Sequence, residues 1–117
     1  MKKILVCGLF ALLVACADDS SSPPPPTPTP IPMVCCSGTL TWENNKESDL
    51  AGYRVYRSVT AVIPNDETRK VFFLASVTQP TFHDTTGIEM TTYYYIVTAY
   101  DTADNESQNS NEVNITY

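Results

Sequence analysis

The side chains able to do chemistry are few and scattered in this sequence. A single histidine, His83, precedes Asp84 directly, and the chain holds four cysteines. Two neighbours in sequence do not form the nucleophile–base–acid arrangement of a hydrolase, and no Gly-x-Ser-x-Gly turn accompanies them. We therefore assign no catalytic residue and predict that the protein is not an enzyme.

Metal binding is equally poorly supported. The polar run Asp101, Asp104, Asn105 and Glu106 lacks the Asp-x-Asp-x-Asp-Gly spacing of a calcium loop, and is interpreted as a solvated turn. Cys35 and Cys36, with the distant His83, lack the ligand spacing of a zinc site. The sequence predicts no metal site and no cofactor.

The length and net charge of the chain restrict the kinds of partner that it can be expected to bind. The 117 residues suit one domain, and 7 basic against 13 acidic residues give a formal net charge of −6. Nucleic-acid-binding surfaces are basic, so no nucleic-acid partner is expected.

The first fifteen residues resemble an export signal. Residues 1–15 read MKKILVCGLFALLVA, two lysines followed by an uncharged apolar run from Ile4 to Ala15. That run is shorter than the about 20 residues that a membrane-spanning helix needs. A charged start, a short apolar stretch and a small terminal residue are typical of a signal peptide.

The end of this segment, Leu13-Val14-Ala15-Cys16, resembles the lipobox of bacterial lipoproteins. The resemblance implies cleavage before Cys16, a diacylglycerol on its thiol and an acyl chain on its new amino group. Several acyl chains hold a protein firmly at a membrane. Within that family, Ala17 in place of Asp after the cysteine favours the bacterial outer membrane over the inner one. An ordinary signal peptide with a chance cysteine is the alternative.

Residues 16–32 are interpreted as the lipidated cysteine and a spacer. Seven of the nine prolines of the chain lie here. Proline has no amide donor and favours polyproline II, so residues 23–32 form a semi-rigid rod of roughly 30 Å. The alternative interpretation is a docking peptide.

Residues 33–117 have the periodicity of strands. Apolar and polar side chains alternate over 39–43, 53–57, 93–100 and 113–116, and polar turns separate these runs. A further strand is expected over 69–77. The pattern predicts an all-β, seven-stranded antiparallel sandwich.

Two stretches carry a specific resemblance. TLTWENNKESDLAGYRVYR, residues 39–57, and TTYYYIVTAYDTADNESQNSNEV, residues 91–113, are similar to fibronectin type III domains of the bacterial kind. The family has a Trp on its second strand, Tyr-x-Val on its third and Tyr-x-x-x-Val-x-Ala on its sixth. The resemblance implies an immunoglobulin-like sandwich over residues 33–117. The residues expected in its core are Leu40, Trp42, Tyr53, Val55, Tyr93 and Val97.

Three details of the resemblance can be checked. Pro32 lies only ten residues before Trp42, so the first strand is expected to be short or missing. Asp104 occupies a position where the family favours Gly, and Asp tolerates a left-handed backbone. Tyr93 occupies the position of the tyrosine corner, so Tyr93→Phe is expected to destabilise more than Tyr94→Phe.

Two cysteines remain after the signal and the anchor. Side chains alternate along a strand, so Cys36 is expected to face the core on the same side as Leu40, and Cys35 is expected to face outward. Two unpaired thiols, a strained vicinal disulfide and a link to another chain all stay open.

The feature most suggestive of function is the outer face of one sheet. Its members are expected to be Arg54, Tyr56, Tyr94, Ile96 and Tyr100. Tyrosine and arginine are frequent in protein-binding hot spots, and tyrosine rings also stack on sugars. Plain cross-strand pairing is the alternative.

The sequence therefore predicts a membrane-anchored surface lipoprotein that presents a non-catalytic protein-binding or adhesion module. The expected partners are the membrane, through the acyl chains on Cys16, and an envelope or extracellular protein. The alternatives are a carbohydrate-contacting module of the cell envelope and a purely structural spacer or assembly subunit.

Overall fold

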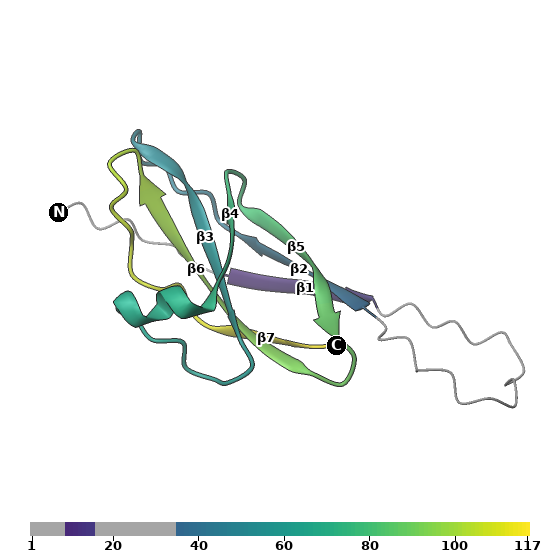
Figure 1. Cartoon of the computed structure of the whole chain (residues 1–117). Coiled ribbons are helices and arrows are strands. Elements are labelled where there is room, and N and C mark those ends of the chain that lie inside the picture. Colours follow the sequence, from purple (N-terminus) through teal and green to yellow (C-terminus); the bar gives the residue numbers. More distant parts are fainter. Residues whose placement is uncertain (1–8, 16–34) are drawn as a thin grey trace, which may run out of the picture.

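The computed structural model describes residues 9–15 and 35–117, which form two antiparallel sheets packed face to face (Figure 1). One sheet has the strand order β1-β2-β5, with β1 at Leu9–Ala15, β2 at Cys35–Trp42 and β5 at Thr81–Ile88. The other has the order β4-β3-β6-β7, with β3 at Leu50–Ser58, β4 at Phe73–Val77, β6 at Thr92–Asp101 and β7 at Val113–Thr116. The predicted all-β antiparallel sandwich is confirmed. Among the described residues, no helix is long and apolar enough to span a membrane.

The first strand does not come from the residues next to Cys35. Leu9–Ala15, in the segment that resembles a signal peptide, pairs antiparallel with β2, from Leu9 opposite Trp42 to Ala15 opposite Ser37 (Figure 1). A register shift lies between Leu12 and Val14. Lipidation of Cys16 and the spacer 16–32 concern residues outside the described part of the chain, so both stay predictions.

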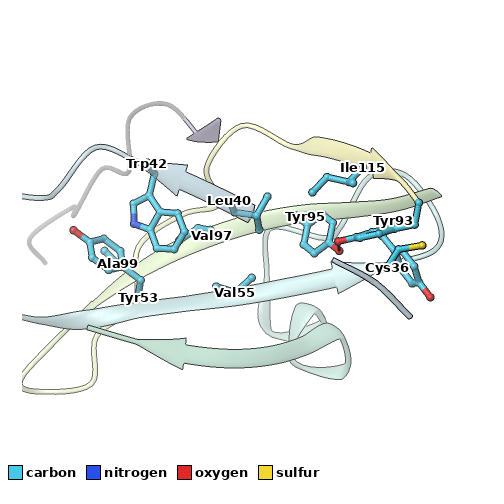
Figure 2. Packing of buried hydrophobic residues seen from close by; sticks show 11 residues of the cluster. Cys36, Leu40, Trp42, Tyr53, Val55, Tyr93, Tyr95, Val97, Ala99 and Ile115 are labelled. Carbon is cyan, nitrogen blue, oxygen red and sulfur yellow. Dashed lines mark hydrogen bonds between the residues drawn. The ribbon is translucent and has the colours of Figure 1, made fainter. Parts of the chain in front are cut away.

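The core lies between the two sheets, where strand alternation directs one face of each strand inward (Figure 2). The six residues expected in the core are all buried: Leu40, Trp42, Tyr53, Val55, Tyr93 and Val97. Trp42 packs edge-on against Tyr53, with ring centroids 5.3 Å apart. This contact joins β2 to β3 and so connects the sheets.

The connection between β3 and β4 differs from expectation. The strand predicted over 69–77 begins only at Phe73, because Glu67–Phe72 forms a 3-10 helix, η1. Asp66 caps this helix, since its side chain accepts a hydrogen bond of 2.8 Å from the backbone amide of Thr68. The apolar run at 72–74 therefore spans a helix end and a strand start.

The polar run after β6 is a turn, as interpreted from the sequence. Asp104 has a φ of 65°, in the left-handed region that the family fills with Gly. The Asp101 side chain accepts hydrogen bonds of 2.9 Å from the backbone amides of Ala103 and Asn105. The carboxylate of Asp101 thus organises the turn.

Cys36 is fully buried on the inner face of β2, as its parity indicated. It is disulfide-bonded, so the interpretation of Cys36 as an unpaired thiol was wrong.

Candidate binding surface

The outer face of the four-stranded sheet carries the five residues expected to form a binding face. Arg54, Tyr94 and Tyr100 are half-buried there. Tyr56 and Ile96 are each only 1% exposed. The expected open face is therefore corrected, because these last two side chains cannot reach a partner without a rearrangement.

The connection from β3 to β4 causes this burial. Ile63 and Phe72 belong to that connection and pack against Tyr56 and Ile96 as a second small core. Phe73 adds an edge-on ring contact with Tyr56, at 5.9 Å between centroids. Strand alternation showed which face these side chains share, but not that a distant segment folds over it.

A partly buried carboxylate lies beside Tyr56 on the same face of the sheet. Glu106 accepts hydrogen bonds from the hydroxyls of Tyr56 and Thr98, each at 2.5 Å, and from Nη1 of Arg54 at 2.9 Å. Nη2 of Arg69 is 3.3 Å from the same carboxylate. Burial alone would raise the pKa of Glu106, but these hydrogen bonds and Arg69 outweigh it and the pKa is lowered. Glu106 is therefore an ionised structural residue and not a proton donor at neutral pH.

Hydrogen bonds of Arg69 and Asn109 hold the segment between β3 and β4, which covers Tyr56 and Ile96, in place. Arg69 is only 6% exposed and donates to the backbone carbonyl of Ser107 at 3.2 Å. It also donates to Oδ1 of Asn109 at 3.1 Å. Asn109 donates in turn to the carbonyls of Ile63 and Pro64, both at 3.1 Å. A buried charge with these partners holds the segment in one position.

A second set of hydrogen bonds holds this segment at Val62. The backbone amides of Val62 and Ile63 donate to the two carboxylate oxygens of Glu112, at 2.9 and 2.8 Å. Val62 has a φ of 67°, a backbone conformation that β-branched residues rarely adopt. Such strain persists only where surrounding contacts impose it, and it concentrates at functional positions.

The segment that covers Tyr56 and Ile96, residues 59–73, also exposes apolar side chains. We call it the apolar segment. The exposed fractions of its outward side chains are 64% for Val59, 82% for Val62, 80% for Val71 and 51% for Phe73. These four exposed apolar side chains are the candidates on this segment for contact with another protein.

Tyr100 contributes to a different feature, which we call the Tyr100 hollow. This shallow depression of about 410 Å³ is lined by Ser76, Val77, Thr78, Gln79, Thr81 and Tyr100. The guanidinium of Arg54 lies 4.4 Å from the centroid of the Tyr100 ring. Gly52 permits the ring to lie close to β3, because a Cβ there would come within 3.0 Å of the Tyr100 hydroxyl. The hollow combines one aromatic ring with hydroxyl and amide side chains.

His83 and Asp84 do not act together. The His83 ring is hydrogen-bonded to Thr39 at 2.8 Å, whereas Asp84 is 2% exposed. Asp84 accepts hydrogen bonds of 2.8 Å from Arg57 and from the hydroxyl of Tyr95. Among the described residues, no group of three or more His, Cys, Asp and Glu side chains could hold a metal ion.

The tyrosine with the buried hydroxyl network is Tyr95. Besides Asp84, its hydroxyl is hydrogen-bonded to that of Tyr117 at 2.8 Å. Burial, with these two partners, raises the pKa of Tyr95 far above its ordinary value. Tyr93 instead uses its ring, which lies 4.4 Å from the Arg57 guanidinium and edge-on to Tyr117.

Comparison with solved structures agrees with this architecture. A Fn3-like protein from Clostridium thermocellum superposes with a TM-score of 0.63 at 24% identity, over 99% of this chain and 95% of that one. A β-1,2-glucanase from Parabacteroides distasonis matches with a TM-score of 0.52 at 27% identity, over 68% of this chain and 10% of the glucanase. No known family pattern matches the sequence, and a search of curated proteins found no relative. The chain thus folds as a fibronectin type III-like sandwich.

Proposed function

We propose that this protein is a membrane-anchored surface lipoprotein whose fibronectin type III-like domain is a non-catalytic module that binds another envelope or extracellular protein. The fold supports the module, since the whole chain is similar to a Fn3-like protein. The motif Leu13–Cys16 and the proline-rich residues that follow it support the anchor and the spacer.

The observation that carries the binding role is the exposure of Val62 and Val71. Their side chains are 82% and 80% exposed on a segment that Glu112, Arg69 and Asn109 hold in place. Burying apolar area contributes about 25 cal/mol per Å², and a pre-ordered segment loses little entropy on binding. The apolar segment is therefore the protein-binding surface in this proposal.

The anchor and the spacer place this surface away from the membrane. In this proposal acyl chains on Cys16 hold the protein, and the proline composition of residues 23–32 predicts a polyproline II spacer of roughly 30 Å. Cys16→Ser should move the protein from the detergent phase to the aqueous phase in a phase-partition experiment. Retention of the variant in the detergent phase would refute lipidation.

Partner capture by crosslinking on intact cells tests the surface. Val62→Ser combined with Val71→Ser should abolish the crosslinked species and leave the midpoint of chemical unfolding nearly unchanged. Met90→Ser is the matched control, because Met90 is 90% exposed but lies in the turn between β5 and β6. Capture that persists in the double variant, or that is lost equally in the control, would contradict the proposal.

A second candidate is carbohydrate contact at the Tyr100 hollow. An aromatic ring beside hydroxyl and amide groups can stack on a sugar and bond to its hydroxyls. The similarity to part of a β-1,2-glucanase also favours this candidate. Glycan arrays with the domain and with Tyr100→Ala test it, and Tyr94→Ala serves as control. Binding that Tyr100→Ala abolishes and Tyr94→Ala retains would favour the carbohydrate role.

A further inference from the structure

β2 has a neighbour on each side only while β1 is present. β5 pairs with one edge of β2 over Cys35–Thr41, and Leu9–Ala15 pairs with the other edge over Ser37–Trp42. Cleavage before Cys16, on which the proposed function rests, removes every residue of β1. The mature protein then exposes one edge of β2.

The mature chain contains no obvious replacement for β1. Residues 16–32 are polar at their start and then hold seven prolines, which lack the amide donor of a strand ladder. The remaining strands, from β3 to β7, already belong to the two sheets. An unpaired strand edge is a template for pairing with another chain.

The position beside β2 that β1 would leave empty accommodates an apolar strand. The strand that leaves it reads LFALLVA and has no polar side chain. Beside it, Leu40 is fully buried and Trp42 is 5% exposed on the inner face of β2. β1 also contacts β7, the edge strand of the opposite sheet, so it closes one side of the sandwich. Removal of β1 therefore leaves backbone groups of β2 unpaired and opens the side of the sandwich next to β7.

We propose that the mature protein accepts a β-strand from a different protein, an extended apolar segment that lies antiparallel to β2 along residues 37–42. Backbone hydrogen bonds to β2 hold the donor, and its apolar side chains cover Leu40 and Trp42. This strand-acceptor edge is distinct from the apolar segment at residues 59–73.

A second copy of this chain fits the position less well. Two β2 edges could pair with each other and satisfy their backbone groups. However, the inner side chains of the second β2, such as its Leu40, already fill their own core. Such a dimer would leave the side that faces β7 uncovered, so a dedicated apolar donor is the occupant that fits.

The test uses residues 16–117 with Cys16→Ser and a synthetic peptide of residues 9–15 flanked by lysines for solubility. The peptide should slow hydrogen exchange at the backbone amides of residues 37–42 by about tenfold or more, and raise the unfolding midpoint. The same peptide with Leu12→Pro is the matched control, because proline removes a donor and disrupts the strand. If residues 16–117 are unfolded alone, the LFALLVA peptide must restore native Trp42 fluorescence.

Three results would overturn the inference. These are the absence of protection by the peptide, equal protection by the proline control, and a dimer that already protects residues 37–42 before peptide is added. The intact mass of the protein from membranes separates this inference from the proposed function. Loss of residues 1–15 without peptide binding overturns only the strand acceptor. Retention of residues 9–15 overturns the cleavage and the open edge together.

Discussion

The carboxylate of Asp84 lies 2.8 Å from the guanidinium of Arg57, and this ion pair joins the two sheets of the sandwich. Arg57 is on β3, and Asp84 is on β5 with a side chain only 2% exposed. The hydroxyl of Tyr95 and both donors of Thr86 complete the shell around the carboxylate. The ion pair is expected to stabilise the fold, because both oxygens of the buried Asp84 carboxylate accept hydrogen bonds.

Removing the carboxylate should be severely destabilising. Asp84→Ala removes the carboxylate that pairs with Arg57 and accepts from the hydroxyl of Tyr95, which should lower the free energy of unfolding by about 3–5 kcal/mol. Urea denaturation followed by Trp42 fluorescence measures this change. Glu89→Ala, at an exposed position, is the control and should change stability by less than about 0.5 kcal/mol. A loss in Asp84→Ala no larger than in the control would contradict the structural role.

Stability should fall in acid because of two carboxylates. Burial opposes ionisation of Asp84, but hydrogen bonds from Thr86, Tyr95 and Arg57 outweigh it and lower its pKa, and the pKa of Glu106 is lowered similarly. A pKa that is lower in the folded state means that the stabilisation is present above the unfolded value, about 3.9 for Asp. It is lost as the pH falls through the folded value.

Unfolding free energy measured from pH 7 down to pH 2 should therefore decline below about pH 4. Asp84→Asn should reduce the slope of that decline, because one of the partly or fully buried carboxylates with a lowered pKa is gone. An identical slope in the wild type and in the variant would exclude Asp84 as a source of the pH dependence.

The three neighbouring tyrosines of β6 should differ in their response to removal of the hydroxyl. Tyr95→Phe deletes two buried hydrogen bonds, to Asp84 and to Tyr117, and should cost about 1–3 kcal/mol. Tyr93→Phe keeps the ring that contacts Arg57, and Tyr94→Phe changes a half-buried side chain, so each should cost less. Chemical denaturation of the three variants under one condition ranks them. The resemblance drew attention to Tyr93 and did not single out Tyr95; its expectation that Tyr93→Phe costs more than Tyr94→Phe stays a prediction, which the same measurement checks.

Gly87 should tolerate no side chain while Tyr117 is present. A Cβ at Gly87 would lie 2.4 Å from Cδ1 of the Tyr117 ring, so Gly87→Ala should destabilise by about 1–3 kcal/mol through overpacking. Tyr117→Ala removes the obstructing ring. In a double-mutant cycle, the effect of Gly87→Ala should become much smaller in that background. Strict additivity of the two substitutions would refute the clash.

Glu112 should control the order of the apolar segment more than global stability. Glu112→Ala removes the acceptor for the amides of Val62 and Ile63, so hydrogen exchange at these two amides should accelerate at least about tenfold. Partner capture should weaken in parallel, since the strained backbone at Val62 loses its support. Glu67→Ala is the control, because Glu67 lies on the exposed part of the same segment and pairs with Lys70. Unchanged exchange in Glu112→Ala would contradict the fastening role.

Much of the core could be predicted from local patterns. Leu40, Tyr53 and Val97 are inward because alternation along a strand is a property of the backbone itself. The left-handed backbone at Asp104 was also expected, since Asp tolerates it better than most residues and stands where fibronectin type III domains favour Gly. The first feature follows from strand geometry and the second from the resemblance, and neither requires knowledge of contacts between distant residues.

The candidate surface could be predicted only in part. Tyr56 and Ile96 do share a sheet face, but the connection that carries Ile63 and Phe72 covers them. The fastening of that connection by Arg69 and Asn109 depends on residues far apart in the chain. A local sequence pattern cannot predict a contact between residues so far apart in the chain.

The sequence by itself determined the two-faced strands, the side of each that is buried, and a chain poor in reactive groups. Only the tertiary structure decided that Asp84 accepts hydrogen bonds from Arg57 and Tyr95, that Tyr56 and Ile96 are covered by Ile63 and Phe72, and that the exposed Val62 is held by Glu112. The physical reason is that alternation follows from covalent geometry, whereas the partners of a buried charge and the cover of an outer face arise only when distant segments meet.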